Sequence, residues 1–169
     1  VVEELNRQNA EIAAQPPIFL ALEGGFHGKL VGSIQLTHNP AYRTPFGALA
    51  RPARFVPFDE PGALGKILQE ERAALRELTV TGGVVRLTER DLPIVTAFLL
   101  EPVQGEGGIR EVGPELAEEI SAGCRAADIP VIIDEIQSGM GRCGAFFASS
   151  QIGLRGDYYA LSKSLGGGV

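Results

Sequence analysis

The chain has 169 residues, enough for one domain with a buried core. Its 15 basic and 21 acidic side chains give a net charge of −6, which argues against nucleic acid or an anionic membrane as its main partner. No apolar run approaches the roughly 18 residues of a membrane span. The two cysteines, Cys124 and Cys143, form neither a disulfide framework nor a CxxC metal site, so we expect a cytoplasmic protein without a metal.

The first third of the chain predicts a helix end, one strand and a long loop. Residues 1–13 are interpreted as the end of a helix that Pro16 and Pro17 stop. The apolar run 18–22 predicts a buried strand, followed by a tight glycine loop over 24–28 and a short helix over 29–36. Five prolines and glycines break the stretch 38–57, which is therefore expected to be loop-like.

The middle of the chain predicts one long amphipathic helix over 59–78. Asp59 is expected to cap it, and leucines and isoleucines fall on one side, namely Leu64, Ile67, Leu68, Leu75 and Leu78. The stretch 79–93 around Gly82 and Gly83 is expected to be an irregular connection or a small hairpin.

The last third alternates strands and a helix. Residues 94–100 predict a strand that ends at Glu101, residues 114–127 a helix, and residues 131–133 a second strand. A shorter apolar segment follows over 158–161. The order strand, helix, strand predicts an α/β fold in which the two strands run parallel.

Two reactive side chains stand at the ends of the last two strands. Asp134 closes the apolar run 131–133, and Lys163 lies just past residues 158–161, before three glycines. Open α/β sheets bind ligands at the carboxyl ends of their strands. A buried carboxylate can hold a protonated heterocycle there, and a lysine can form a Schiff base with a carbonyl group.

Other interpretations of these residues are possible. An apolar strand that ends in Asp134 and Glu135 also resembles the Walker B acid of a nucleotide hydrolase, but the stretch 62–67 lacks the spacing and the hydroxyl of a phosphate loop. Residues 139–144 match the pattern GxGxxG, but they do not follow the strand directly and no amphipathic helix comes after them. Taken alone, Lys163 fits a solvated surface lysine and Asp134 a helix cap or ion-pair partner.

Four blocks in order resemble the class III pyridoxal-phosphate aminotransferases, the family of the ornithine, acetylornithine and 4-aminobutyrate enzymes. The blocks are Gly25-Phe26-His27-Gly28, residues 101–108 (EPVQGEGG), residues 134–142 (DEIQSGMGR) and residues 162–168 (SKSLGGG). The resemblance implies a fold-type I transferase, in which a mainly parallel sheet is flanked by helices. It also implies pyridoxal 5′-phosphate as the cofactor.

The resemblance implies a role for most of the quoted residues. Lys163 would be the Schiff-base lysine and the proton carrier, and Asp134 would keep the pyridine nitrogen protonated. Ring contacts would come from Phe26 and Ile136 on the two faces and from Gln137 at the ring hydroxyl. The resemblance assigns His27 no clear proton-transfer role, although we count it among the cofactor-binding residues. Glu101 and Glu106 are candidates on the substrate side.

The resemblance also implies that residues 1–169 are only part of an enzyme of this family. Family members carry a phosphate-binding segment before the first block and a small domain after the last, and residues 1–169 contain neither. We therefore interpret residues 1–169 as the central part of the large domain, inactive in isolation, with weak cofactor binding and a tendency to aggregate. The full-length form is expected to be a homodimer that takes an amine or amino-acid donor and a 2-oxo acid acceptor. A non-catalytic relic or interaction module that keeps the fold is the alternative.

Overall fold

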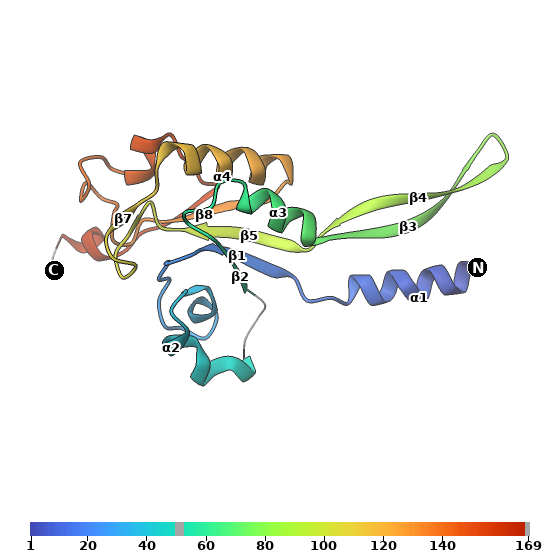
Figure 1. Ribbon diagram of the computed structural model, residues 1–169, viewed down its shortest axis with the longest axis horizontal. Coiled ribbons are helices and arrows are strands. Elements are labelled where there is room, and N and C mark those ends of the chain that lie inside the picture. The colour runs from blue at the N-terminus through green and yellow to red at the C-terminus, as the bar shows by residue number, and fades with distance from the viewer. Residues whose placement is uncertain (50–52, 168–169) are drawn as a thin grey trace.

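The computed structural model describes residues 1–49 and 53–167, and its centre is a five-stranded sheet (Figure 1). The strands lie in the order β2-β1-β5-β8-β9 and every neighbouring pair is parallel. Their bounds are β1 Ile18–Leu22, β2 Ala53–Val56, β5 Val95–Leu100, β8 Val131–Asp134 and β9 Tyr158–Ala160. The predicted α/β fold with a mainly parallel sheet is confirmed.

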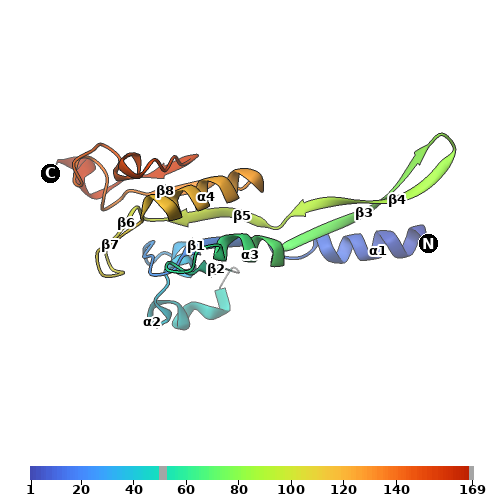
Figure 2. The same cartoon turned by 45° about the horizontal axis from the view of Figure 1, so that its top comes forward.

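Two helices cover one face of this sheet, α3 (Ala63–Glu70) and α4 (Pro114–Ala126) (Figure 2). Gly123 lets them approach closely, because a Cβ there would come within 3.0 Å of a Leu64 methyl carbon. Between helices and sheet lies the main core, whose largest buried side chains include Leu20, Leu22, Leu64, Phe98, Leu100, Ile120 and Ile133. Because α4 connects β5 to its parallel neighbour β8, the predicted strand–helix–strand unit is present.

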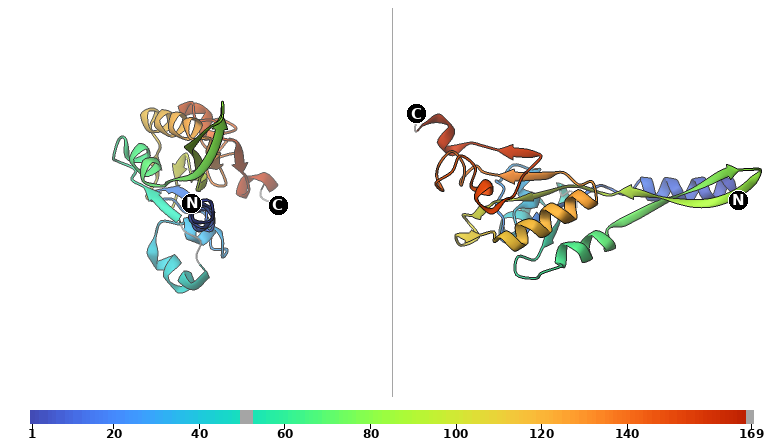
Figure 3. Two further views of the ribbon diagram at one scale, coloured as in Figure 1. Left: turned by 90° about the vertical axis from the view of Figure 1, so that its right-hand side faces the viewer. Right: turned by 90° about the horizontal axis from the view of Figure 1, so that it is seen from above.

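A narrow arm projects from the sheet (Figures 1 and 3). It consists of α1 (Val2–Ala13) and the antiparallel hairpin of β3 (Arg72–Thr81) and β4 (Val84–Pro93). Gly82 and Gly83 form the two-residue turn, both with positive φ, which glycine adopts without strain. The helix predicted over 59–78 is therefore wrong beyond Glu70. Asp59 does not cap α3 either, because Gly62 occupies the N-cap and Asp59 pairs with Arg110.

The stretch 29–57 is more structured than its prolines suggest. Instead of a helix over 29–36 there is a 3-10 turn at Ser33–Leu36. The expected loop 38–57 contains α2 (Pro40–Arg43), a 3-10 segment at Thr44–Leu49 and the edge strand β2. Pro52, one of the residues on which the loop prediction rested, lies outside the described residues.

Smaller elements complete the chain: β6 (Val103–Gln104), β7 (Arg110–Glu111) and 3-10 turns at Ala148–Ile152 and Lys163–Gly166. Over the described ranges, no helix is long and apolar enough to cross a membrane.

Candidate active site

The carboxyl ends of four parallel strands bring the predicted site residues to one edge of the sheet. The loop 24–28 follows β1, Glu101 follows β5, Asp134 ends β8, and Lys163 comes three residues after β9. Strands that run parallel end at the same edge, so residues more than a hundred positions apart gather there.

The closest polar contact at this edge joins His27 to Asp134. The His27 Nδ1 atom lies 2.8 Å from Asp134 Oδ2, and both side chains are almost fully buried. An ionised carboxylate only accepts, so Nδ1 is the donor. The second carboxylate oxygen, Oδ1, accepts from the backbone N–H of Ile136 at 3.1 Å. Asp134 is thus oriented from two sides.

The backbone around His27 is itself held in place. Thr37 accepts a hydrogen bond from the His27 N–H at 2.9 Å and donates one to the Gly28 carbonyl at 3.2 Å. Gly25 faces the other nitrogen of the imidazole, since a Cβ at Gly25 would lie 2.8 Å from His27 Nε2. Thr37 thus holds the backbone of His27, and the missing side chain at Gly25 leaves room for the imidazole. Thr37 lies ten residues after His27, and no sequence motif links the two positions, so sequence analysis did not predict this contact.

Glu101 lies beneath the same loop and is buried. Its two carboxylate oxygens accept from the backbone N–H groups of Phe26, at 3.0 Å, and Gly105, at 3.3 Å. Burial raises the pKa of Glu101, and the negative charge of Asp134 adds to the rise, while the two N–H donors and His27 oppose it. Glu101 therefore connects the loop after β1 to the loop after β5.

Phe26 is half-buried and lines a pocket of about 350 Å³. Its ring packs edge-on against Tyr42 with the centroids 5.8 Å apart. The exposed Glu106 also lines this pocket, together with backbone and side chains from the loops after β1 and β5. A pocket lined by an aromatic ring and a carboxylate suits a planar or cationic ligand.

Two glutamines pack against glycines in the loops after β1 and β5. Gln104 is fully buried, donates to the Glu23 carbonyl at 2.7 Å and fills the space that a side chain at Gly24 or Gly107 would need. Gln137 lies against Gly105, where a Cβ would come within 2.1 Å of its Oε1. Gly105 and Gly107 of the EPVQGEGG block cannot carry a side chain here, because these glutamines occupy the volume that a Cβ would need. Sequence analysis identified Gln137 but missed Gln104.

Lys163 is exposed at the start of the last 3-10 turn. Asp134 is the register partner of Ala160, and the Glu135 N–H donates to the Ala160 carbonyl at 3.0 Å. The end of β8 is therefore fixed against the segment that leads to Lys163. No salt bridge joins Lys163 to another residue of the described ranges. Gly168, part of the fourth block, lies outside them.

Glu135, unlike its neighbour Asp134, hydrogen-bonds only groups that lie outside the candidate site. It is fully buried, accepts from Ser138 Oγ at 2.6 Å and from the Ser149 N–H at 2.9 Å, and so ties the loop after β8 to the 3-10 turn at Ala148–Ile152. Of the acidic pair that ends the strand, only Asp134 is directed to the site edge.

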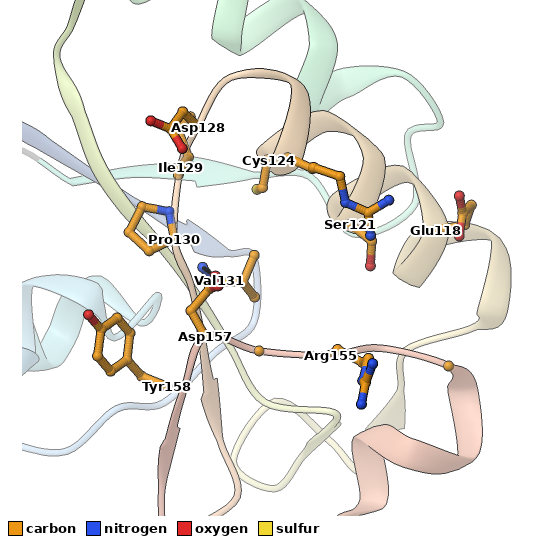
Figure 4. Close-up of a pocket in the computed structure, with 13 residues that line it drawn as sticks. Glu118, Ser121, Cys124, Asp128, Ile129, Pro130, Val131, Arg155, Asp157 and Tyr158 are labelled. Carbon is orange, nitrogen blue, oxygen red and sulfur yellow. Dashed lines mark hydrogen bonds between the residues drawn. The ribbon is translucent and has the colours of Figure 1, made fainter.

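A pocket of about 610 Å³ lies away from these residues (Figure 4). It is found at the amino ends of β8 and β9, beside α4, and its lining includes Val131, Tyr158, Arg125 and Arg155. None of the predicted site residues contributes to it.

The two nucleotide-binding alternatives fail on geometry. The backbone N–H groups of Gly62 and Leu64 at the start of α3 donate to the Glu119 carboxylate, which occupies the position that a phosphate would need. Residues 139–144 form turns and lead to a 3-10 turn, whereas a dinucleotide loop opens an α-helix directly after the strand.

The chain is similar to a known protein family over most of its length. The family model described as "Aminotransferase class-III" matches residues 4–169. An acetylornithine aminotransferase from Methanosarcina mazei is 31% identical over 160 residues, which are 94% of this chain and 35% of that protein. A putrescine aminotransferase from Pectobacterium atrosepticum is 36% identical over 151 residues, 89% of this chain and 29% of that protein.

A solved structure of an ornithine aminotransferase from Toxoplasma gondii superimposes with a TM-score of 0.72 at 23% identity. The alignment covers 98% of this chain and 37% of that one, and at this identity it shows a shared fold. The chain therefore spans about a third of the length of the proteins that it matches.

Proposed function

The chain belongs to the class III aminotransferase family, and we propose that it forms the central part of the cofactor-binding domain of a longer enzyme. That enzyme would move an amino group from an amine or amino-acid donor to a 2-oxo acid. The observation that carries the proposal is the buried His27–Asp134 pair at the edge of the sheet where Lys163 also lies.

The residues at this edge fit pyridoxal phosphate. A carboxylate has room for about four hydrogen bonds, and two are in use on Asp134, so lone pairs remain for a protonated ring nitrogen. Phe26 offers an aromatic surface and Lys163 a primary amine that can attach to an aldehyde. When bound, the cofactor would supply an electron sink for the carbon next to the transferred nitrogen.

His27 and Asp134 would act as one unit. The imidazole N–H orients the Asp134 carboxylate, and burial strengthens the attraction between that carboxylate and a positive ring nitrogen. His27 would therefore be a positioning residue that touches Asp134 and not the reacting atoms. This assigns to His27 the role that the family resemblance left open.

Lys163 would carry the proton between the donor carbon and the cofactor. A free amine at the sheet edge can serve as base and then as acid, provided that it stays close to the carbon from which it takes the proton. The 3-10 turn at Lys163–Gly166 follows β9 after two residues, so the fixed strand limits how far the amine can move.

The remaining residues would define the walls of the site. Phe26 would stack on one face of the ring and Ile136 would pack on the other, while Gln137 would hydrogen-bond the ring hydroxyl. Glu101 would hold the backbone of Phe26 in place through the contact already described. Glu106 would contact the donor or a group beyond these 169 residues, because it is exposed and lines the same pocket as Phe26.

We propose that the full-length protein is a cytoplasmic homodimer. Both cysteines are free, in keeping with a reducing compartment, and the family resemblance supports the dimer. The net charge of −6 supports small-molecule partners over nucleic acid.

Borohydride reduction tests the proposal. The longer protein is incubated with pyridoxal phosphate, reduced, digested and analysed by mass spectrometry, and the pyridoxyl group is expected on Lys163. Lys163→Arg keeps the charge but should abolish the label and the visible absorbance, whereas Lys66→Arg on α3 should leave both unchanged. Label on Lys29 or Lys66 would overturn the site, and an unlabelled protein without absorbance would favour the relic.

A further inference from the structure

Two glycine-rich loops form part of the pocket beside Phe26. The loop after β1 supplies Gly24, Gly25 and Phe26, and the loop after β5 supplies Glu106 and Gly107. Glycine loses more conformational freedom on folding than any other residue, so loops of this composition need contacts from outside to hold one shape. Such contacts decide how Phe26 and Glu106 lie relative to each other.

The Gln104 side chain lies between these two loops. It is fully buried, and its Nε2 donates to the Glu23 carbonyl at 2.7 Å, directly before the first loop. Its Oε1 lies against glycines of both loops, because an added Cβ would come within 2.5 Å of it at Gly24 and within 2.8 Å at Gly107. One buried side chain therefore contacts both loops.

Glu101 joins the same loops at a different point, through the backbone N–H groups of Phe26 and Gly105. A single contact leaves a loop free to rotate about it, whereas two contacts also hold its orientation. Glu101 and Gln104 contact different residues of the loop after β1, so together they oppose such a rotation. Gln104 is therefore expected to control the direction in which the Phe26 ring faces.

Stability alone does not explain a glutamine at position 104. Among the described residues its Oε1 has no hydrogen-bond partner, although this atom is buried. A buried acceptor without a partner lowers stability, and an apolar side chain of similar length would avoid that loss. Only a donor can bind the Glu23 carbonyl, so this hydrogen bond is what the glutamine contributes.

We propose that Gln104 is a positioning residue for cofactor binding and that it acts through Phe26. Its amide holds the backbone just before Phe26 and thereby sets the direction of the aromatic ring. Gln104 itself touches neither the cofactor nor the reacting atoms. The proposal rests on the proposed function in one respect, namely that Phe26 stacks on pyridoxal phosphate.

The affinity of the longer protein for pyridoxal phosphate tests this. The apparent Kd is measured by titrating the cofactor and following its visible absorbance. Gln104→Met keeps the length of the side chain but removes the donor, and it should raise the Kd about tenfold. Gln151→Met is the matched control and should change the Kd less than about twofold. The Gln151 Nε2 atom also donates to a backbone carbonyl at 2.7 Å, that of Cys143, but outside the site.

A double-mutant cycle with Phe26→Leu separates positioning from a general loss of stability. If Gln104 acts through Phe26, Gln104→Met should change the Kd less than about twofold once the aromatic ring is gone. Ile120→Val, which removes one carbon from the core, should lower stability without a change in the Kd in either background. Equal weakening by Gln104→Met with and without the Phe26 ring would overturn the proposal, and so would a wild-type Kd.

Hydrogen exchange gives a readout that needs no cofactor. In the cofactor-free protein, Gln104→Met should speed exchange about tenfold in the peptides that contain Phe26 and Gly105, whose N–H groups are hydrogen-bonded. The two control variants should leave exchange in these peptides unchanged. Wild-type exchange rates in Gln104→Met would overturn the positioning role. A wild-type protein that binds no pyridoxal phosphate would overturn the proposed function instead.

Discussion

His27 and Asp134 are 107 positions apart in the sequence, yet His27 Nδ1 lies 2.8 Å from Asp134 Oδ2. The contact crosses from the loop after β1 to the end of β8, with β5 between the two strands. It therefore joins the loop after β1 to the end of β8 at the candidate site. Because both side chains are buried, loss of either leaves the other without its partner in a region that water reaches poorly.

His27→Ala is expected to lower the free energy of unfolding by about 1.5–3 kcal/mol, the range for a hydrogen bond to a charged group. Urea unfolding followed by circular dichroism measures this. His38→Ala is the comparison: His38 is partly exposed, lies 3.7 Å from an exposed Glu23 carboxylate and packs edge-on against Phe55, so we expect a smaller loss of about 0.5–1 kcal/mol. Equal losses in the two variants would show that the buried contact adds no stability.

Glu101→Gln is expected to change how stability depends on pH. The folded-state pKa of Glu101 is raised above its ordinary value of 4.5, so the folded state holds the proton more tightly than the unfolded state. The free energy of unfolding should therefore fall as pH rises from about 4.5 through the folded-state pKa. Above that pKa it should stay at the lower value. Glutamine does not titrate, so this part of the slope should disappear.

Denaturant unfolding between about pH 4 and 7 measures both slopes. Glu106→Gln removes an exposed carboxylate from the same sequence block and should keep the wild-type slope. If the two variants changed the slope alike, burial of Glu101 would not be its cause.

How much of this the sequence could predict depends on the range of the interactions. Strands β1, β5 and β8 have short apolar runs with clear ends, so their prediction, and with it the placement of Asp134 at a strand end, needed only local pattern. Leu75 and Leu78 are spaced as on a helix. However, apolar and polar residues alternate after them, and the Gly82-Gly83 turn favours a hairpin, which is the structure that forms. Strand β2 was missed because prolines surround it.

The contacts within the site were harder to predict. The sequence around His27 does not indicate that its side chain contacts Asp134. That contact depends on the strand order β1-β5-β8. The same holds for Gln104, whose partners are the Glu23 carbonyl and two glycines from separate loops. Residue types identified the candidate site, and tertiary structure was needed to see how the site is supported.

Gly139→Ala is expected to strain the loop that follows Asp134. A Cβ at this position would lie 2.7 Å from the Glu135 carbonyl oxygen and 3.1 Å from a Leu161 methyl carbon, and the backbone oxygen cannot move without the strand end. We expect a loss of about 1–3 kcal/mol, the usual cost of overpacking. Gly32→Ala is the control, since nothing lies within 4 Å of a Cβ there and its φ is −75°. Equal shifts of the unfolding curves for both variants would show that a Cβ at position 139 does not clash with the Glu135 carbonyl oxygen.

Cys124 is expected to resist alkylation in the folded protein while Cys143 reacts. Burial, with a smaller contribution from the negative charge of Asp157, raises the pKa of Cys124 from 9.0 to about 12. At pH 8 this lowers its thiolate fraction about a thousandfold, and only the thiolate attacks. Cys124 is also fully buried, whereas Cys143 is partly exposed, so access acts in the same direction.

Iodoacetamide labelling at pH 8, followed by peptide mass spectrometry, should therefore show one modified cysteine in the native protein and two in guanidinium chloride. Cys143→Ser should leave the native protein unlabelled, and Cys124→Ser should not change the rate at Cys143. Because α4 holds Cys124 against the core beneath the sheet, its labelling rate under native conditions also reports how often that helix opens. Labelling of Cys124 as fast as Cys143 would show that α4 does not stay packed in the isolated chain.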